Sequence, residues 1–203
     1  MPGRFGTDGI RGPVGSEIDA DLALALGRAV GHRLGGEGRT VLLGRDTRRS
    51  GEMLSAALTA GLTATGTDVV DLGIVTTPCL VHASADERHA AGIMVSASHN
   101  AAEDNGLKVV VAGRKVDDDT EEELDRLIDD GSSIEARPNA RLGRIRADLD
   151  AVEEDADGLA QEHAVHRGGD AVAGLALADR EDAGGLDVTG AVRPVRSGGG
   201  GST

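Results

Sequence analysis

The feature that most constrains the fold is an alternation of helical and extended apolar patterns as far as residue 130. Leucine and valine recur every four residues within 19–34 and 51–65, which predicts two amphipathic helices. Short apolar runs bounded by glycine or charge predict four strands, over 40–44, 68–72, 91–96 and 107–111. Helices placed between strands indicate an α/β domain, and we expect three layers, α/β/α, around a mixed and largely parallel sheet.

Residue types typical of helix starts and stops accompany these patterns. Ser50 is placed to cap the second helix, and Pro78 suits the first turn of a third. Thr120 and Glu123 form a capping box before a further helix, which Gly131 ends. The acidic residues around this box are interpreted as a helix start with favourable N-terminal charges.

The core of this domain must be built from aliphatic side chains, because the 203 residues include one phenylalanine and neither tryptophan nor tyrosine. After about residue 150 the sequence becomes aperiodic and rich in glycine, alanine and aspartate. We therefore expect an α/β domain over 1–150, followed by a poorly structured segment over 151–203. The abrupt change is interpreted as the mark of a truncated or frame-shifted chain.

Charge and composition exclude several classes of partner. The formal net charge of −14 argues against a nucleic-acid partner, because nucleic-acid phosphates need a basic surface. Abundant carboxylates with only two lysines fit either a salt-adapted cytoplasm or a GC-rich genome. With no apolar run of the roughly 18 residues that span a bilayer, no signal peptide and a single cysteine, we expect a cytoplasmic protein without a membrane partner. Protein partners are not indicated by the sequence.

Two loops fall at the ends of predicted strands, where α/β sheets place ligands. FGTDGIRG (5–12) combines glycines with Arg11, whose guanidinium is an always-charged fork of donors. GRDTRRSG (44–51) lies between a strand and a helix start, where Arg45, Arg48 and backbone amides are suited to bind phosphate. Each loop also has a structural interpretation, as a tight turn in the first and as arginines paired with a carboxylate in the second.

A third loop follows the strand predicted over 91–96. It begins with the run Ser96-Ala97-Ser98, in which Ser98 is placed where its hydroxyl projects into a cleft. His99 and Asn100 add polar contacts and are candidates for the same site. Taken by themselves, adjacent serine and histidine residues more often form a polar loop than a catalytic pair.

The end of this loop predicts where its lysine lies. Asn105-Gly106 is a typical turn dipeptide, and it predicts a turn that returns the chain to a strand. That return brings Lys108 toward the serine, where a lysine stabilises negative charge or moves a proton.

Together, FGTDGIRG, GRDTR, SASHN and DNGLK, in this order and spacing, resemble the N-terminal domain of the α-D-phosphohexomutases. That family includes phosphoglucosamine mutase, phosphomannomutase and phosphoglucomutase, and the resemblance covers about residues 3–145. It implies that Ser98 is a phosphoserine that donates its phosphoryl group to a hexose or hexosamine phosphate. The bisphosphate then returns the other phosphoryl group, so that phosphate moves between C6 and C1.

The resemblance also implies a set of active-site residues and a metal. Arg11, His99 and Lys108 match active-site positions of the family, and Lys108 is the candidate for acid–base assistance. Phosphorylated Ser98 would also be a ligand of Mg²⁺, which stabilises transition-state charge.

The sequence departs from the family's pattern in two respects. Ala101 stands where the family has proline after Ser-His-Asn, which leaves the loop less rigid. The family's Asp-Gly-Asp-x-Asp-Arg metal loop, sugar-selecting loop and phosphate loop find no match in this sequence, so a metal has too few ligands. We therefore expect a mutase that is inactive or incomplete as an isolated chain. The alternative is a phosphosugar-binding or regulatory remnant without turnover.

Two further hypotheses have little support. A serine hydrolase would need His99 as the base for Ser98, but adjacent residues leaving a strand point to opposite sides, and the Gly-x-Ser-x-Gly elbow is missing. His163 and His166 have a spacing that suits metal binding on a helix, but two histidines without a nearby third ligand are usually surface residues.

Overall fold

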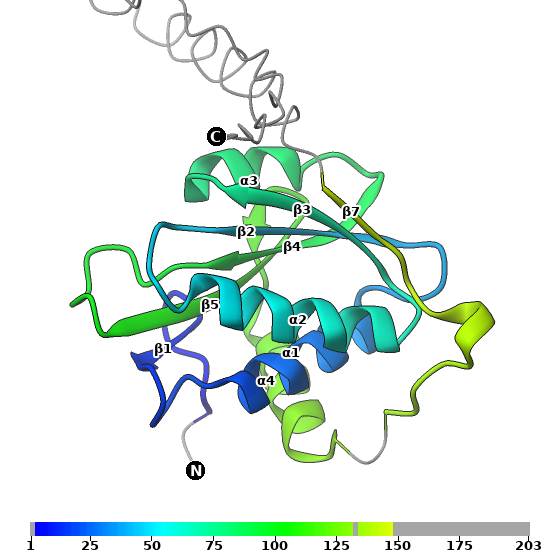
Figure 1. Cartoon of the computed structure of the whole chain (residues 1–203), viewed down its shortest axis with the longest axis horizontal. Helices are drawn as coiled ribbons and strands as arrows, with labels where there is room; N and C mark the ends of the chain where they lie inside the picture. The colour runs from blue at the N-terminus through cyan, green and yellow to red at the C-terminus, as the bar shows by residue number, and fades with distance from the viewer. Residues whose placement is uncertain (1–2, 132–133, 148–203) are drawn as a thin grey trace, which may run out of the picture. The chain divides into compact units, whose positions relative to one another are not determined.

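The computed structural model describes residues 3–131 and 134–147 (Figure 1). The predictions for 151–203, and for His163 and His166, lie outside the described residues. The strands are β1 (Ile10–Pro13), β2 (Thr40–Arg45), β3 (Asp68–Ile74), β4 (His89–Val95), β5 (Asp104–Val111), β6 (Arg114–Lys115) and β7 (Ile145–Ala147). The helices are α1 (Ala20–Arg33), α2 (Gly51–Ala64), α3 (Thr77–Ala83) and α4 (Asp118–Asp129), with a 3₁₀ turn at Asn139–Arg141.

The strands form one sheet in the order β1-β5-β4-β2-β3-β7, with β6 paired to β5. The pairings β2–β3, β2–β4 and β3–β7 are parallel, whereas β1–β5, β4–β5 and β5–β6 are antiparallel. The predicted mixed α/β sheet is therefore confirmed, with an antiparallel part on the β5 side. No helix within the described ranges is long and apolar enough to cross a membrane.

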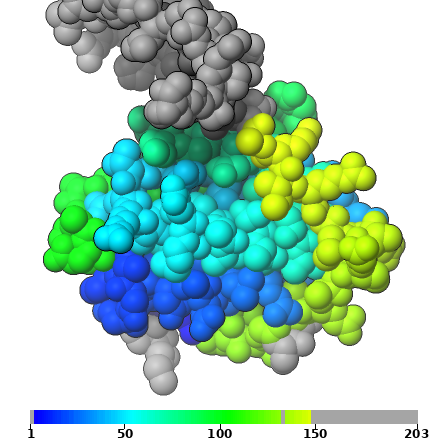
Figure 2. Space-filling view, in the orientation of Figure 1, coloured from blue at the N-terminus to red at the C-terminus, as the bar shows by residue number. Residues whose placement is uncertain are grey.

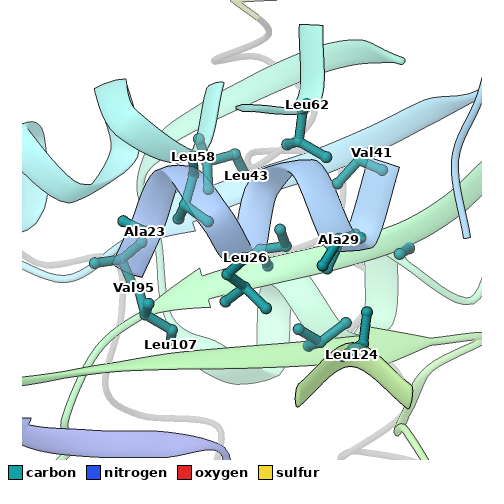
Figure 3. Packing of buried hydrophobic residues seen from close by; sticks show 14 of the residues in the cluster. Ala23, Leu26, Ala29, Val41, Leu43, Leu58, Leu62, Val95, Leu107 and Leu124 are labelled. Atoms are coloured by element: carbon teal, nitrogen blue, oxygen red, sulfur yellow. The ribbon is translucent and has the colours of Figure 1, made fainter. Parts of the chain in front are cut away.

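Helices cover both faces of the sheet and make the expected three layers. Helices α1, α2 and α4 pack on one face around the larger hydrophobic core, and α3 packs on the other with a smaller one (Figure 1). Figure 3 shows Leu26 of α1 between Leu58, Leu107 and Leu124 of the elements around it. Side chains of α2 cover much of the face turned to the viewer in Figure 2.

The core is aliphatic, as the composition predicts. The largest fully buried side chains are leucine, isoleucine and methionine, whereas Phe5 is only partly buried against the cluster. Each fully buried leucine or isoleucine contributes about 1.5–3 kcal/mol relative to an exposed one. The many buried leucines thus replace the aromatic residues that the sequence lacks.

Helices α1 and α2 approach so closely that their backbones touch. A Cβ added at Gly27 of α1 would overlap the carbonyl oxygen of Leu58, and one at Gly61 of α2 would overlap that of Leu24. Only glycine leaves room for this crossing. The close approach fixes the position of α2 relative to α1, and with it the position of the first residues of α2.

Two predicted caps differ from the structure. Helix α4 is capped by Asp117, whose side chain accepts the backbone N–H of Thr120 at 2.9 Å, so the predicted capping box of Thr120 and Glu123 is wrong. Ser50 occupies the N-cap position of α2 but makes no capping hydrogen bond. Its Oγ instead accepts a hydrogen bond from Asn105 at 2.8 Å. In α4 the carboxylate of Asp117 takes the place of the predicted Thr120 cap, and in α2 the side chain of Asn105 engages the Ser50 hydroxyl.

Pro78 lies in the first turn of α3, as predicted, and Thr76 caps that helix. Asn105 and Gly106 do not form the predicted turn, because both lie within β5. The turns are formed earlier, by hydrogen bonds from Asn100 N–H to the Ala97 carbonyl and from Asp104 N–H to the Ala101 carbonyl, each 3.1 Å.

The crossing of α1 and α2 predicts an unusual response to Gly27→Ala. Alanine normally stabilises a helix by about 1 kcal/mol relative to glycine. Here the added Cβ overlaps the Leu58 carbonyl, so we expect the free energy of unfolding in urea to fall by roughly 1–3 kcal/mol. The control is Gly131→Ala, whose Cβ meets nothing within 4 Å. Stability that is unchanged or higher in Gly27→Ala would contradict the close approach.

Candidate functional site

Ser98 lies in the loop between β4 and β5, and its side chain is exposed while Ser96 and Ala97 before it are buried. The Ala97–Asn100 turn carries it, closed by the 3.1 Å hydrogen bond between those two residues. Ser98 is therefore presented to solvent just after the end of a strand, where a side chain is accessible to a ligand.

The backbone of Ser98 has a φ of +57°, and Ala112 is the only other non-glycine residue in the described part with a positive φ. A positive φ is the region of the backbone map in which glycine is normally found. A side chain in this region costs roughly 1–2 kcal/mol, so the surrounding contacts must hold it there.

Asp46 and Ser96 provide part of that support. The N–H of Ser98 donates to Oγ of Ser96 at 3.0 Å, and the Ser96 hydroxyl donates to Oδ2 of Asp46 at 2.7 Å. Asp46 is itself fixed by its own N–H, which donates to the carbonyl of Val95 at 3.0 Å. The loop after β2 is thus joined directly to the loop after β4.

Arg48 supplies the rest of the support. Its Nη2 donates to the carbonyls of Ser98 and Asn100, each at 2.9 Å, and its Nη1 donates to those of Asp104, at 2.9 Å, and Ala101. Its Nε donates to Oδ2 of Asp46 at 3.1 Å. The side chain predicted to bind phosphate therefore lies against the loop that carries Ser98.

Arg11 of β1 and Lys108 of β5 meet at Asp8, a residue that we did not predict. Lys108 Nζ lies 2.9 Å from Oδ2 of Asp8, and Arg11 Nη2 contacts the same oxygen. Asp8 stands within the FGTDGIRG motif, and its acidic side chain among glycines and a basic residue is the signal that would have indicated it. Arg11 and Lys108 thus converge on a carboxylate.

Strand register places this cluster beside the start of the serine loop. Arg11 pairs with Gly106, two residues before Lys108, so both side chains lie on one face of the sheet. A Cβ at Gly106 would lie 2.7 Å from the Ser96 carbonyl oxygen and 3.0 Å from Cγ of Arg11. Glycine at this position therefore lets the Arg11 stem and the backbone at Ser96 pass close together.

The ionisation of Asp8 reflects its surroundings. Partial burial by itself raises the pKa of Asp8, but the hydrogen bond and charge of Lys108, together with the charges of Arg11 and Lys115, outweigh it. The pKa of Asp8 therefore lies below its ordinary value of 3.8. Near neutral pH the cluster holds one carboxylate between cations, with a surplus of positive charge.

The other three predicted site residues have different surroundings. Arg45 makes only long ion pairs, 3.8 Å to Asp71 of β3 and 4.0 Å to Glu52 of α2. His99 is exposed. Asn100 donates from Nδ2 to Oδ2 of Asp104 at 3.0 Å and so braces the loop internally.

A metal site is not complete within the part of the chain that the structure describes. No group of three or more histidine, cysteine, aspartate or glutamate side chains there is placed to hold a metal ion. The oxygen atoms around Ser98 that could bind a metal are mostly carbonyls, and these already accept hydrogen bonds from Arg48. The cluster of Arg11 and Lys108 around Asp8 carries a net positive charge, which disfavours a cation. These residues do not by themselves fit a Mg²⁺ ion.

Comparisons with known proteins agree on one family. The model of phosphoglucomutase/phosphomannomutase, alpha/beta/alpha domain I, matches residues 2–135. The chain is 46% identical over 159 residues to phosphoglucosamine mutase of Symbiobacterium thermophilum and 47% identical over 148 residues to that of Neisseria subflava. These matches cover 75% and 70% of this chain but 36% and 33% of those proteins, so the chain spans about a third of the length of these relatives.

Solved structures give the same result. A phosphoglucomutase/phosphomannomutase family protein from Burkholderia thailandensis superposes with a TM-score of 0.59 at 36% sequence identity. The match covers 68% of this chain and 31% of that chain.

The positive φ of Ser98 predicts that glycine is better tolerated there than at the next residue. Ser98→Gly relieves the unfavourable contact of Cβ, whereas His99→Gly, at an ordinary φ, only adds chain entropy to the unfolded state. We expect Ser98→Gly to exceed His99→Gly in free energy of unfolding by about 1–2 kcal/mol in urea denaturation. Equal loss of stability in the two variants would contradict the strained turn.

The lowered pKa of Asp8 predicts how its contribution to stability depends on pH. A carboxyl group whose folded pKa lies below its unfolded value of 3.8 stabilises the fold above that pH. The contribution is lost as the pH falls through the folded pKa. We expect wild type to exceed Asp8→Asn in urea midpoint at about pH 6, and the difference to shrink below about pH 4.

A matched control comes from Asp86, whose side-chain hydrogen bond with Arg88 lowers its pKa to about 2. Any difference between wild type and Asp86→Asn should likewise shrink only as the pH falls through the folded pKa of Asp86, about 2. A difference for Asp8→Asn that stays constant from about pH 6 to pH 2 would exclude the ion pair as its source.

Proposed function

This chain belongs to the phosphoglucomutase/phosphomannomutase family, and from that premise we propose that Ser98 receives and donates the phosphoryl group in a phosphosugar mutase reaction. The observation that carries the proposal is the presentation of Ser98, an exposed serine at a strand exit, two residues after the point where the Ser96 backbone and the Arg11 stem pass close together at Gly106. Phosphoryl transfer depends on positioning and on concentrated positive charge, and this end of the sheet offers both.

The reaction has two half-steps that mirror each other. In the first, a hydroxyl oxygen of the sugar monophosphate bonds to the phosphorus on Ser98, the bond from phosphorus to Oγ breaks, and the hydroxyl proton is passed to Oγ. In the second, Oγ attacks the other phosphoryl group of the bisphosphate and the proton returns to the sugar oxygen. The net change moves phosphate between C6 and C1 of a hexose or hexosamine.

Lys108 is the residue that we propose for proton transfer and charge stabilisation in these steps. Its side chain is mostly buried and its Nζ is paired with Asp8, which supports a defined position for the ammonium group. Arg11 adds a fixed positive charge at the same carboxylate. His99 and Asn100 are proposed as sugar-phosphate contacts on the turn that carries Ser98, and Arg45 as a contact from the end of β2.

The substrate class is proposed from the relatives. Proteins that share 46% and 47% identity with this chain are named phosphoglucosamine mutases, which makes a glucosamine phosphate the first substrate to test. Mg²⁺ on phosphorylated Ser98 remains a prediction from the resemblance, because the described residues supply no set of ligands for it. A cytoplasmic location and the lack of a nucleic-acid partner likewise remain predictions.

Phosphorylation of Ser98 can be tested directly by intact mass. We expect the chain to gain one phosphoryl group after incubation with glucosamine 1,6-bisphosphate, and the gain to disappear in Ser98→Ala. The control is Ser84→Ala, because Ser84 is a buried serine at the end of α3 whose hydroxyl bonds the Val81 carbonyl, so this variant should leave the gain intact.

Two outcomes would contradict this proposal. A gain that survives in Ser98→Ala would place the phosphoryl group on another residue. Binding of the bisphosphate, seen by calorimetry, without any gain in mass would instead support the alternative function, a phosphosugar-binding remnant that does not turn over.

A further inference from the structure

We propose that Arg48, acting with Asp46 and Ser96, is a positioning group that holds the backbone of Ser98 in its turn. This role differs from the phosphate ligand that the sequence predicts for Arg48. The inference rests on the proposed function, since it concerns the residue proposed to carry the phosphoryl group. It concerns only how that residue is held, and not which sugar it meets.

Four hydrogen bonds form a closed circuit through Ser98. Its N–H donates to Oγ of Ser96 at 3.0 Å, and that hydroxyl donates to Oδ2 of Asp46 at 2.7 Å. The same carboxylate oxygen accepts Nε of Arg48 at 3.1 Å, and Nη2 of Arg48 donates to the Ser98 carbonyl at 2.9 Å. Because both polar backbone groups of Ser98 are held, rotation about its φ breaks a member of the circuit.

The remaining N–H groups of Arg48 bond further carbonyls of the same loop. A guanidinium has five N–H groups in a fixed planar fork, and those of Arg48 bond Asp46 and the carbonyls of Ser98, Asn100, Ala101 and Asp104. A phosphate could therefore bind this side chain only by displacing a contact to the loop. The arrangement matches a brace between two turns better than a ligand for a mobile anion.

Asp46 and Arg48 form an Asp-x-Arg unit, and a second such unit, Asp86 and Arg88, shows that the local turn forms without burial of the arginine side chain. Arg88 donates from its backbone N–H and from Nε to the two carboxylate oxygens of Asp86, each at 2.8 Å, as Arg48 does to Asp46. The Arg88 side chain is 82% exposed, whereas that of Arg48 is 12% exposed. The two units share their local bonding and differ in the contacts to the Ser98 loop, so Arg88 is an internal control.

The experiment compares Arg48→Met and Arg48→Lys with Arg88→Met and Arg88→Lys in the whole 203-residue chain. Three quantities are measured: amide hydrogen exchange at Ser98 by NMR, the dissociation constant for glucosamine 1,6-bisphosphate, and the rate of phosphoryl incorporation. Exchange is recorded without sugar, so it reports on the turn even when no phosphoryl group is transferred.

If Arg48 is a positioning group, Arg48→Met speeds exchange at Ser98 about tenfold or more, because hydrogen bonds to a charged group are lost. Arg48→Lys, which retains the charge but not the fork, restores part of the protection. The dissociation constant for the bisphosphate stays within about twofold, the rate of incorporation falls, and both Arg88 variants resemble wild type.

Two results would overturn the inference. Unchanged exchange at Ser98 with a bisphosphate affinity weakened tenfold would assign Arg48 to phosphate binding. If Arg48→Met speeds amide exchange throughout α1, α2 and the sheet as much as at Ser98, the role of Arg48 is a general structural one. A wild-type chain that gains no phosphoryl group would count against the proposed function, while exchange at Ser98 would still decide the positioning role.

Ser96→Ala provides a second route that does not depend on Arg48 variants folding. It removes the acceptor of the Ser98 N–H, and Ser98 exchange should again be faster. The control is Ser84→Ala, since Ser84 is also buried, accepts the Gly113 N–H at 3.3 Å and donates to the Val81 carbonyl at 2.7 Å. Equal exchange at Ser98 in these two serine variants would contradict the circuit.

Discussion

The guanidinium of Arg48 joins two loops that strand pairing has already placed side by side. Strands β2 and β4 are parallel neighbours, and Arg45 lies in register with Val95 at their carboxyl ends. The chain after each strand therefore leaves the sheet at the same edge, where Asp46 N–H bonds the Val95 carbonyl. A buried charge needs such partners, because an unpaired guanidinium would lose its hydration without compensation. The loop of Ser98 takes its shape from this contact.

The antiparallel return of β5 adds the second half of the site. By pairing with β4 on one side and β1 on the other, β5 brings Lys108 and Arg11 to one face, two positions apart in register. Asp8 compensates two partly buried cations that would otherwise repel each other, and its pKa is lowered as a result. In a chain with a net charge of −14, such a local surplus of positive charge depends on strand order rather than on composition.

The spacing of apolar residues predicts the helices and strands that bury a continuous apolar face. It does not predict strands that are defined only by backbone hydrogen bonds to a neighbouring strand. The helix and strand patterns at 19–34, 40–44 and 51–65 correspond closely to α1, β2 and α2, because their leucines and valines fill the core. Strands β1, β6 and β7 were not predicted. They are short, and the residues of β6 and β7 are exposed, so no alternation marks them. Asn105-Gly106 resembles a turn by composition, but in the fold Asn105 is a buried link to Ser50, and only glycine fits beside Ser96.

In the site, too, the sequence motifs predict which residues take part but not which contacts their side chains make. Motif order predicts Ser98, Arg11 and Lys108 as site residues, but it does not distinguish Arg45 from Arg48, whose contacts are set by the direction of each side chain. A serine that exchanges phosphoryl groups must keep Oγ in place while the group attached to it changes in charge and size. The circuit through Asp46, Ser96 and Arg48 engages only the backbone N–H and carbonyl of Ser98 and leaves Oγ outside it. Fixing the backbone in this way would be compatible with both proposed half-reactions, because no supporting bond would have to break when a phosphoryl group arrives or departs.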